Sequence, residues 1–304
     1  MHNFALLIII MSTLTITTIQ SNLQWEDKNA NLQMFEEKIG QLQQRTEVVI
    51  LPEMFSTGFS MQAQTLAEKM DGPTVSWMKK LAAEKKIILT GSLIIEDEGN
   101  YYNRLVWMLP NGQYGYYDKR HLFGYGQEDQ HYTPGYKRLI ASVKGWKLNL
   151  LVCYDLRFPV WSRQKPAKAE LADLVASELE ARDLPLPPPQ ETDLAEPAHV
   201  LTPEYDILVY VANWPERRNH AWKTLLQARA IENQSYVVGV NRVGTDGMGL
   251  QYSGDSMIVD AMGTVLYTKA QEEDVFTITL QKEPLEETRN KLPFLKDADR
   301  FIIA

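Results

Sequence analysis

The chain has very little cysteine: Cys153 is the only one among its 304 residues. A single cysteine excludes an intrachain disulfide and a cysteine-rich metal site, and it favours a reduced, cytoplasmic setting. Long apolar runs are lacking too, because the run within MHNFALLIIIM is too short to span a bilayer. That run has no Lys or Arg before it and no Ala-x-Ala-like cleavage site after it. We therefore expect residues 1–11 to be an extension rather than a secretory signal, and we expect no membrane partner.

Positive charge is also scarce. The 31 Lys and Arg residues are outnumbered by 39 Asp and Glu residues, which gives a formal net charge of -8 and a pI of about 5.3. Proteins that bind nucleic acids normally carry a basic surface, so we expect no nucleic-acid partner. A small anionic substrate remains compatible with this charge, because a pocket can be locally positive in an acidic protein.

What the sequence does contain is an alternation of strand-like and helix-like segments. Alternating apolar residues predict a strand over 13–20, and the spacing of Leu32, Phe35 and Ile39 predicts a helix over 28–43. Further strands are expected at 47–53, 86–96, 148–152, 206–215 and 235–244, hairpins at 104–119 and 256–268, and helices at 73–86 and 220–234. The pattern predicts one α/β domain over residues 12–304, with helices on the outer faces of its sheets.

Residues 164–204 interrupt this alternation. Their first part is rich in Ala, Leu and Glu and could form one helix, whereas the second part, LPLPPPQETDLAEP, is acidic and proline-rich and predicts an extended loop. We expect this segment to be a tolerated surface insertion. The alternative is a lid, because long loops near active sites often have that role.

Three polar residues follow predicted strands or the first predicted hairpin: Glu53, Lys119 and Cys153. In α/β proteins functional groups gather outside the carboxyl ends of strands. A cysteine nucleophile needs a base or a cation nearby, and none of the five histidines has a motif-like setting, so a glutamate and a lysine are candidates for these roles. The alternative interpretation is a buried core cysteine with two surface charges.

Three motifs in order, LPEMFSTGF, DKRHLF and CYDLRFP, resemble the nitrilase superfamily of carbon–nitrogen hydrolases. The motifs YVANWP, ARAIENQSYVVGVNRVG and YSGDSMIVDAMG extend this resemblance, which covers about residues 12 to 280 except 164–204. Within the superfamily, CYDLRFP, YVANWP and NRVGTDG are most similar to the omega-amidases, which act on 2-oxo dicarboxylic acid monoamides.

The resemblance implies a four-layer α-β-β-α sandwich, commonly a homodimer that buries one helical layer, and no metal or organic cofactor. It also implies a catalytic triad of Glu53 as general base, Lys119 as oxyanion-stabilising cation and Cys153 as nucleophile. Glu128 falls at the place of a second family glutamate, and it would orient Lys119 or the attacking water. The backbone N–H of Tyr154 would complete the oxyanion hole.

The expected reaction is the release of ammonia from a small-molecule omega-amide through a cysteine thioester. The substrate carries a carboxylate, so we expect cations or hydrogen-bond donors in the pocket. The candidates are Arg157, Trp214, Arg217, Arg218 and Arg242. Arg157 has an alternative role in structural pairing within the DLRFP turn. Alternative functions are a nitrilase or an N-carbamoyl amidohydrolase, and, in a different class, a catalytically silent binding protein. The presence of all three triad residues speaks against the silent protein.

Overall fold

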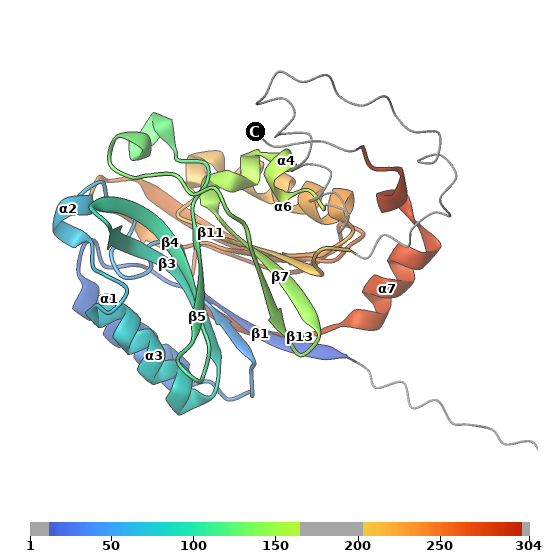
Figure 1. The fold of residues 1–304 in the computed structure, drawn as a ribbon, viewed down its shortest axis with the longest axis horizontal. Coiled ribbons are helices and arrows are strands. Elements are labelled where there is room, and N and C mark those ends of the chain that lie inside the picture. Colours follow the sequence, from blue (N-terminus) through green and yellow to red (C-terminus); the bar gives the residue numbers. More distant parts are fainter. Residues whose placement is uncertain (1–11, 165–202, 300–304) are drawn as a thin grey trace, which may run out of the picture.

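Two β-sheets pack face to face, and helices cover their outer surfaces (Figure 1). The computed structural model describes residues 12–164 and 203–299. The expected extension at 1–11, and the helix and loop expected within 164–204, lie outside the described residues. The two ends of that segment are described: Gln164 is buried and Glu204 is half-buried.

The first sheet has six strands in the order β13-β1-β2-β3-β4-β5. β1, β2 and β3 run parallel to one another, whereas β13, β4 and β5 are added antiparallel. The strands are β1 (Thr13–Gln20), β2 (Val48–Ile50), β3 (Ile88–Asp97), β4 (Asn100–Met108), β5 (Tyr114–Asp118) and β13 (Asp274–Gln281).

The second sheet has seven strands in the order β10-β11-β9-β8-β7-β6, with β12 paired to β11. Its centre, β7-β8-β9, is parallel, and the remaining pairings are antiparallel. The strands are β6 (Leu139–Val143), β7 (Trp146–Val152), β8 (Ile207–Val211), β9 (Tyr236–Val240), β10 (Val243–Thr245), β11 (Gln251–Val259) and β12 (Val265–Ala270).

Helices begin where the sequence supplies caps. Asp27 caps the first helix by accepting a hydrogen bond from the backbone N–H of Ala30 at 3.0 Å, and Pro73 occupies the first turn of another. The longer helices are α1 (Lys28–Gly40), α3 (Pro73–Lys85), α6 (Asn219–Asn233) and α7 (Lys282–Lys291). The short ones are α2 (Ala63–Leu66), α4 (Pro159–Ser162), and the 3-10 turns η1 (Gly124–Gly126), η2 (Glu128–Gln130), η3 (Cys153–Arg157), η5 (Glu216–Arg218) and η6 (Phe294–Asp297).

Apolar side chains form cores between these layers. One core joins α1 and α3 to the outer face of the first sheet, with Phe35 and Met78 packed in the same cluster as Val49. A second core includes Ile50 from the first sheet, Leu150 from the second and side chains of α6. The expected four-layer α-β-β-α sandwich is therefore confirmed.

The strands, hairpins and helices predicted for the described residues are present, with the strand expected at 235–244 divided between β9 and β10. Besides short helical turns such as α2 and α4, the elements that the sequence did not predict are β6, β13 and α7. β6 and β13 lie at sheet edges, and β13 keeps most of its residues partly exposed, so its apolar pattern is weak. α7 is strongly polar in sequence. It is held to the start of β8 by ion pairs from Arg289 and Lys282 to Asp206, at 3.0 and 3.1 Å.

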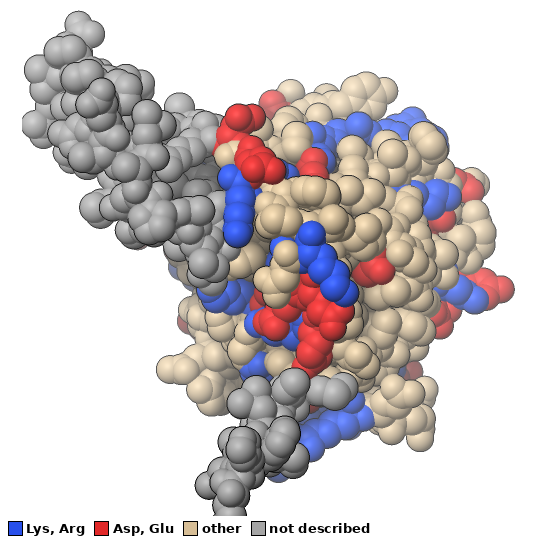
Figure 2. Space-filling view, turned by 90° about the vertical axis from the view of Figure 1, so that its right-hand side faces the viewer, with Lys and Arg blue, Asp and Glu red and all other residues tan. Residues whose placement is uncertain are grey.

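The face that carries α7 has acidic side chains near its centre and basic side chains around them (Figure 2). Basic residues do not gather into one continuous patch on this face. Among the described residues, no helix combines the length and the apolar character that a membrane crossing needs.

The fold brings the ends of several strands to one place. Glu53 comes shortly after β2, Lys119 directly follows β5, Cys153 directly follows β7, and Asn213 comes shortly after β8. β2 and β5 belong to the first sheet, and β7 and β8 belong to the second. Residues far apart in the sequence therefore meet between the two sheets.

Candidate active site

A cavity of about 580 Å³ opens beside these strand ends. Its volume lies within the range typical of small-molecule sites. Cys153, Lys119 and Asn213 contribute to its lining. The other lining residues are mainly aromatic, apolar or charged, and include Trp25, Phe59, Met61, Phe123, Tyr125, Tyr154, Trp214, Met248, Leu250 and Tyr252.

Glu53 is fully buried, and neighbouring side chains hold its carboxylate. Oε1 accepts hydrogen bonds from Asn103 Nδ2 and Lys119 Nζ, both at 2.8 Å. Oε2 accepts the backbone N–H of Asn213 at 2.8 Å, and the Asn213 side chain donates back to the Glu53 carbonyl at 2.6 Å. The carboxylate is thus fixed in one orientation between the two sheets.

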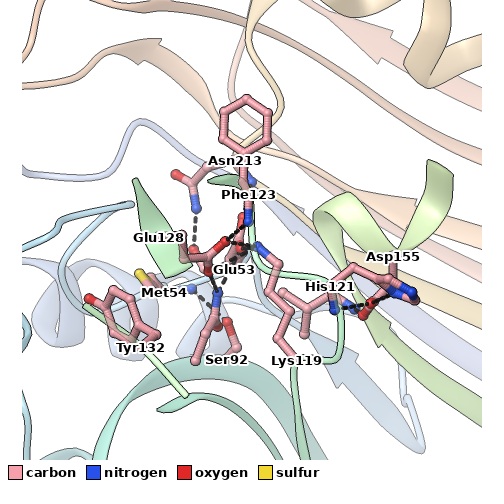
Figure 3. Close-up of polar contacts among 12 residues, drawn as sticks. Glu53, Met54, Ser92, Lys119, His121, Phe123, Glu128, Tyr132, Asp155 and Asn213 are labelled. Carbon is pink, nitrogen blue, oxygen red and sulfur yellow. Dashed lines mark hydrogen bonds and ion pairs between the residues drawn. The ribbon is translucent and has the colours of Figure 1, made fainter. Parts of the chain in front are cut away.

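Lys119 points at two carboxylates, as Figure 3 shows. Its Nζ lies 2.8 Å from Glu53 Oε1, and 3.0 and 2.9 Å from the two oxygens of Glu128. Burial alone would lower the pKa of this ammonium, but the negative charges of Glu128 and Glu53 outweigh burial and raise the pKa above its usual value. Lys119 therefore stays cationic although it is only 1% exposed.

Glu128 lies at the start of η2 and is fully buried. It accepts hydrogen bonds from Lys119, from Asn103 Nδ2 at 3.1 Å and from the backbone N–H of Phe123 at 2.6 Å. Burial raises the pKa of Glu128, Lys119 opposes that shift, and the charge of Glu53 adds to it. The two glutamates thus share one ammonium.

Cys153 is the first residue of η3 and has a left-handed backbone, with φ of 45°. This conformation is costly for a residue other than glycine and places the side chain at a sharp turn after β7. Burial raises the pKa of the Cys153 thiol well above its usual value, the charge of Glu53 raises it further, and Lys119 opposes both. The thiol is thus protonated near neutral pH and depends on a neighbouring base to become nucleophilic.

The structure brings together Glu53, Lys119, Glu128 and Cys153, as expected. It adds two residues that the sequence did not single out, Asn103 and Asn213, which together hold the two carboxyl groups. Asn213 lies in the motif YVANWP and follows a buried strand, so a signal for it existed. Asn103 lies inside β4, where the sequence gives no cue that a polar side chain points into a site.

Three arginines line the cavity: Arg157, Arg217 and Arg218. None of them forms an ion pair with an acidic residue among residues 12–164 and 203–299. Arg218 is half-buried over the ring of Phe123, with 5.0 Å between its guanidinium carbon and the ring centroid. Burial lowers the pKa of Arg218, and the nearby Arg217 lowers it further. We call these three residues the arginine wall.

The other expected substrate contacts differ in placement. Trp214 lines the cavity, and Arg157 lies over its ring at 5.0 Å. Tyr154 also lines it, with its ring against Phe123.

Arg242 does not line the cavity, contrary to the expectation. It is fully buried behind Tyr252, and its guanidinium donates to the backbone carbonyls of Val243 and Leu23. The chain leaves β9 at Val240 and enters β10 at Val243. This break turns the Arg242 side chain into the protein interior.

Comparison with known proteins agrees with this geometry. A family model described as carbon-nitrogen hydrolase matches residues 15–183 and 194–290. The chain is 37% identical over 292 residues to the omega-amidase YafV of Escherichia coli strain K12, with 96% of this chain and 99% of that protein covered. It is 27% identical over 286 residues to the 2-oxoglutaramate amidase of Bacillus subtilis strain 168, covering 93% of this chain and 96% of that protein.

A solved structure shows the same fold. XC1258 from Xanthomonas campestris, a carbon–nitrogen hydrolase superfamily protein with an arsenic adduct in its active site, is 39% identical to this chain. The two structures agree with a TM-score of 0.84 over 97% of this chain and 100% of XC1258. The family match omits residues 184–193, a shorter stretch than the insertion expected at 164–204, whose extent stays a prediction. The chain belongs to the carbon-nitrogen hydrolase family, in the omega-amidase branch of the nitrilase superfamily.

Proposed function

We propose that this enzyme releases ammonia from the terminal amide of a small 2-oxo dicarboxylic acid monoamide, such as 2-oxoglutaramate or 2-oxosuccinamate. The observation that carries the proposal is the pairing of a buried Glu53–Lys119–Cys153 cluster with an arginine wall on the same cavity. The cluster supplies amide chemistry, and the wall supplies cations for the substrate carboxylate at the other end. The omega-amidase and 2-oxoglutaramate amidase relatives support the same substrate class.

In the first half of the reaction Glu53 accepts the Cys153 thiol proton, and the sulfur forms a bond to the amide carbonyl carbon. Negative charge develops on the carbonyl oxygen, where Lys119 and the backbone N–H of Tyr154 stabilise it. Glu53 then returns the proton to the amide nitrogen, the carbon–nitrogen bond breaks, and ammonia leaves. A thioester on Cys153 remains. The raised pKa of the thiol explains why a base is needed at all.

In the second half Glu53 takes a proton from water, and the water oxygen attacks the thioester carbon. The same two donors stabilise the second oxyanion. The carbon–sulfur bond breaks, Cys153 recovers its proton from Glu53, and the carboxylic acid product leaves. Throughout, Glu128 holds Lys119 in place with contacts at 2.9 and 3.0 Å. No step in this scheme uses a metal or an organic cofactor.

The arginine wall is proposed to bind the substrate's carboxylate and 2-oxo group. Guanidinium groups bind carboxylates with paired, charge-assisted hydrogen bonds. Arg218 is the best placed of the three, because it is half-buried at the cavity whereas Arg157 and Arg217 are exposed. The two acidic residues that also line the cavity do not neutralise the wall. Glu26 accepts from Ser60, and Asp246 accepts from Tyr252.

A substrate panel tests this function. We expect ammonia release from 2-oxoglutaramate and 2-oxosuccinamate to be faster than from uncharged amides of the same length. Nitriles and N-carbamoyl amino acids serve as the matched alternatives within the superfamily. A preference for either of those classes, or equal rates on charged and uncharged amides, would contradict the proposed substrate. The proposal also includes a homodimer in the cytoplasm, based on the family resemblance, and light scattering of the purified protein tests the assembly.

A further inference from the structure

One buried carboxylate near the candidate site has no part in the reaction scheme above. Asp155 is fully buried two residues after Cys153. Its Oδ2 accepts the hydroxyl of Tyr117 at 2.7 Å and the backbone N–H of Val152 at 3.0 Å. Its Oδ1 accepts the backbone N–H of His121 at 3.0 Å and lies 2.8 Å from His121 Nδ1. Four donors therefore converge on one side chain.

These donors come from the two segments that carry Lys119 and Cys153. Tyr117 and His121 stand two residues before and two residues after Lys119, so Asp155 binds both flanks of the lysine. Val152 immediately precedes Cys153, so the same carboxylate also binds the nucleophile's own turn. Figure 3 shows His121 and Asp155 to one side of Lys119, with the two glutamates near its ammonium.

The Cys153 turn needs such support. Its left-handed backbone costs about 1–2 kcal/mol relative to an ordinary conformation. Strained residues persist only where surrounding contacts hold them. Further contacts hold Tyr117 and His121, the two side chains that bind Asp155. Trp161 Nε1 donates to Tyr117 Oη at 2.9 Å, and the His121 ring stacks on Phe158 with 3.8 Å between centroids.

We propose that Asp155 is a positioning residue that ties the Lys119 segment to the Cys153 turn and so fixes the cation relative to the nucleophile. Asp155 does not touch the reacting atoms, and it acts through the backbones on either side of them. This inference builds on the proposed function, since it concerns the geometry of that same site.

The test is Asp155→Asn, which keeps the shape of the side chain. Each carboxylate oxygen of Asp155 accepts one backbone N–H, from Val152 or from His121, and a backbone N–H cannot reverse its role. In either orientation of the amide, its NH2 group therefore faces one backbone donor. The hydrogen bond from Val152 or the one from His121 is then lost. We expect kcat to fall roughly 10- to 100-fold, in line with a displacement of about 1 Å at a reacting centre. We expect KM to stay within threefold, because the arginine wall is untouched.

The matched control is Asp206→Asn. Asp155 binds the end of β7 at Val152, and Asp206 binds its other end. Asp206 Oδ2 accepts the backbone N–H of Lys147 at 3.0 Å, and Oδ1 pairs with Arg289. Both variants weaken the contact between a buried aspartate and one end of β7, so both should lower Tm. Only Asp155→Asn should lower kcat. Equal losses of Tm with kcat unchanged in both variants would show that Asp155 is merely structural.

The rate of Cys153 alkylation by iodoacetamide gives a readout that needs no substrate. We expect Asp155→Asn to change this rate at least threefold relative to the parent and to Asp206→Asn. If no omega-amide is turned over but the alkylation rate still changes, the proposed function fails and the positioning role stands. If Asp155→Asn does not fold, His121→Phe keeps the ring stacked on Phe158 and removes only the Nδ1 contact. We expect a severalfold fall in kcat from that variant, and an unchanged kcat and alkylation rate would overturn the inference.

Discussion

The catalytic cluster and the arginine wall border the same cavity but are built in opposite ways. In the cluster, the buried Glu53 and Glu128 both bind the buried Lys119, and two asparagines donate to the carboxylates. In the wall, Arg157, Arg217 and Arg218 are partly or largely exposed and have no acidic partner among the described residues. The charged groups of the cluster have their ionic partners within the protein, whereas those of the wall are available to pair with a ligand.

This difference separates chemistry from recognition. A buried ion network whose members bind one another is rigid, and the loss of one member leaves an uncompensated charge. Such a network suits the bond-breaking steps, which need fixed geometry. Unpaired guanidinium groups on an open cavity wall gain their partner only when an anion binds. Substitutions in the cluster should therefore change kcat, and substitutions in the wall should change KM, largely independently.

The largest effect is expected at the nucleophile. Cys153→Ala removes the only sulfur that can form the thioester, so turnover of omega-amides should fall to background. Tm should change little, because the side chain is small and only its Sγ is lost. Ammonia release and a thermal melt measure the two quantities. Substantial residual turnover would mean that Cys153 is a core residue and that the cluster performs another role.

The next effect separates turnover from thiol reactivity. Glu53→Gln keeps the shape of the side chain but removes the base, so kcat should fall at least about 100-fold. The charge of Glu53 raises the pKa of the Cys153 thiol, whereas Lys119 lowers it. Without that charge the thiol pKa should fall, so more thiolate exists at neutral pH. Alkylation by iodoacetamide should then become faster as turnover becomes slower.

The pH profile of alkylation is the control for the predicted combination of faster alkylation and slower turnover. In the parent the rate should rise with pH towards a high thiol pKa, and in Glu53→Gln the whole profile should move to lower pH. Loss of turnover together with an unshifted alkylation profile would show that Glu53 does not interact with the thiol. Near-normal turnover would remove it from the catalytic cluster.

The sequence predicted the ionisable residues of the cluster better than it predicted the asparagines that hold them. Glu53, Lys119 and Cys153 stand at the ends of predicted elements within three ordered motifs, so both their positions and their meeting place could be inferred. Asn103 lies in the middle of a strand, and its side chain points to the site only because β4 pairs with β5 in a particular register. Register is set by the three-dimensional sheet and has no local sequence signal here.

The fold shows the same limit. Buried parallel strands such as β7 and β8 have nearly continuous apolar runs and were predicted. The edge strand β13 and the polar helix α7 were missed because their stability comes from pairing with β1 and from ion pairs to Asp206. Arg242 was misplaced for a related reason. A charged residue after an apolar strand suggests a pocket, and only the break between β9 and β10 shows that its side chain turns inward.

A smaller effect is expected at the arginine wall. Arg218→Met keeps an unbranched side chain against Phe123 but removes the guanidinium. A hydrogen bond to a charged group contributes about 1.5–3 kcal/mol, so kcat/KM for 2-oxoglutaramate should fall roughly 10- to 150-fold. Most of this fall should come from KM. Arg217→Met is the matched control, because that neighbour is more exposed, and we expect a smaller change from it.

An uncharged amide of the same length sharpens this comparison. Its kcat/KM should be nearly the same in the parent and in Arg218→Met, because it has no carboxylate for the wall to bind. If Arg218→Met lowers kcat on charged and uncharged amides alike, the wall supports the chemistry. The division between the two regions would then be wrong.

The smallest effect on activity is expected at Arg242, which the sequence suggested as a substrate contact. Its guanidinium is fully buried and donates to Val243 O at 3.1 Å and to Leu23 O at 3.2 Å. Arg242→Lys keeps the charge but cannot reproduce the planar fork that reaches both carbonyls. The free energy of unfolding should fall by about 1.5–3 kcal/mol, which a thermal melt would record as a Tm lower by several degrees. KM for 2-oxoglutaramate should stay within twofold, because Tyr252 separates this side chain from the cavity. A tenfold rise in KM with Tm unchanged would instead place Arg242 among the substrate contacts, and the wall would then extend behind the visible lining of the cavity.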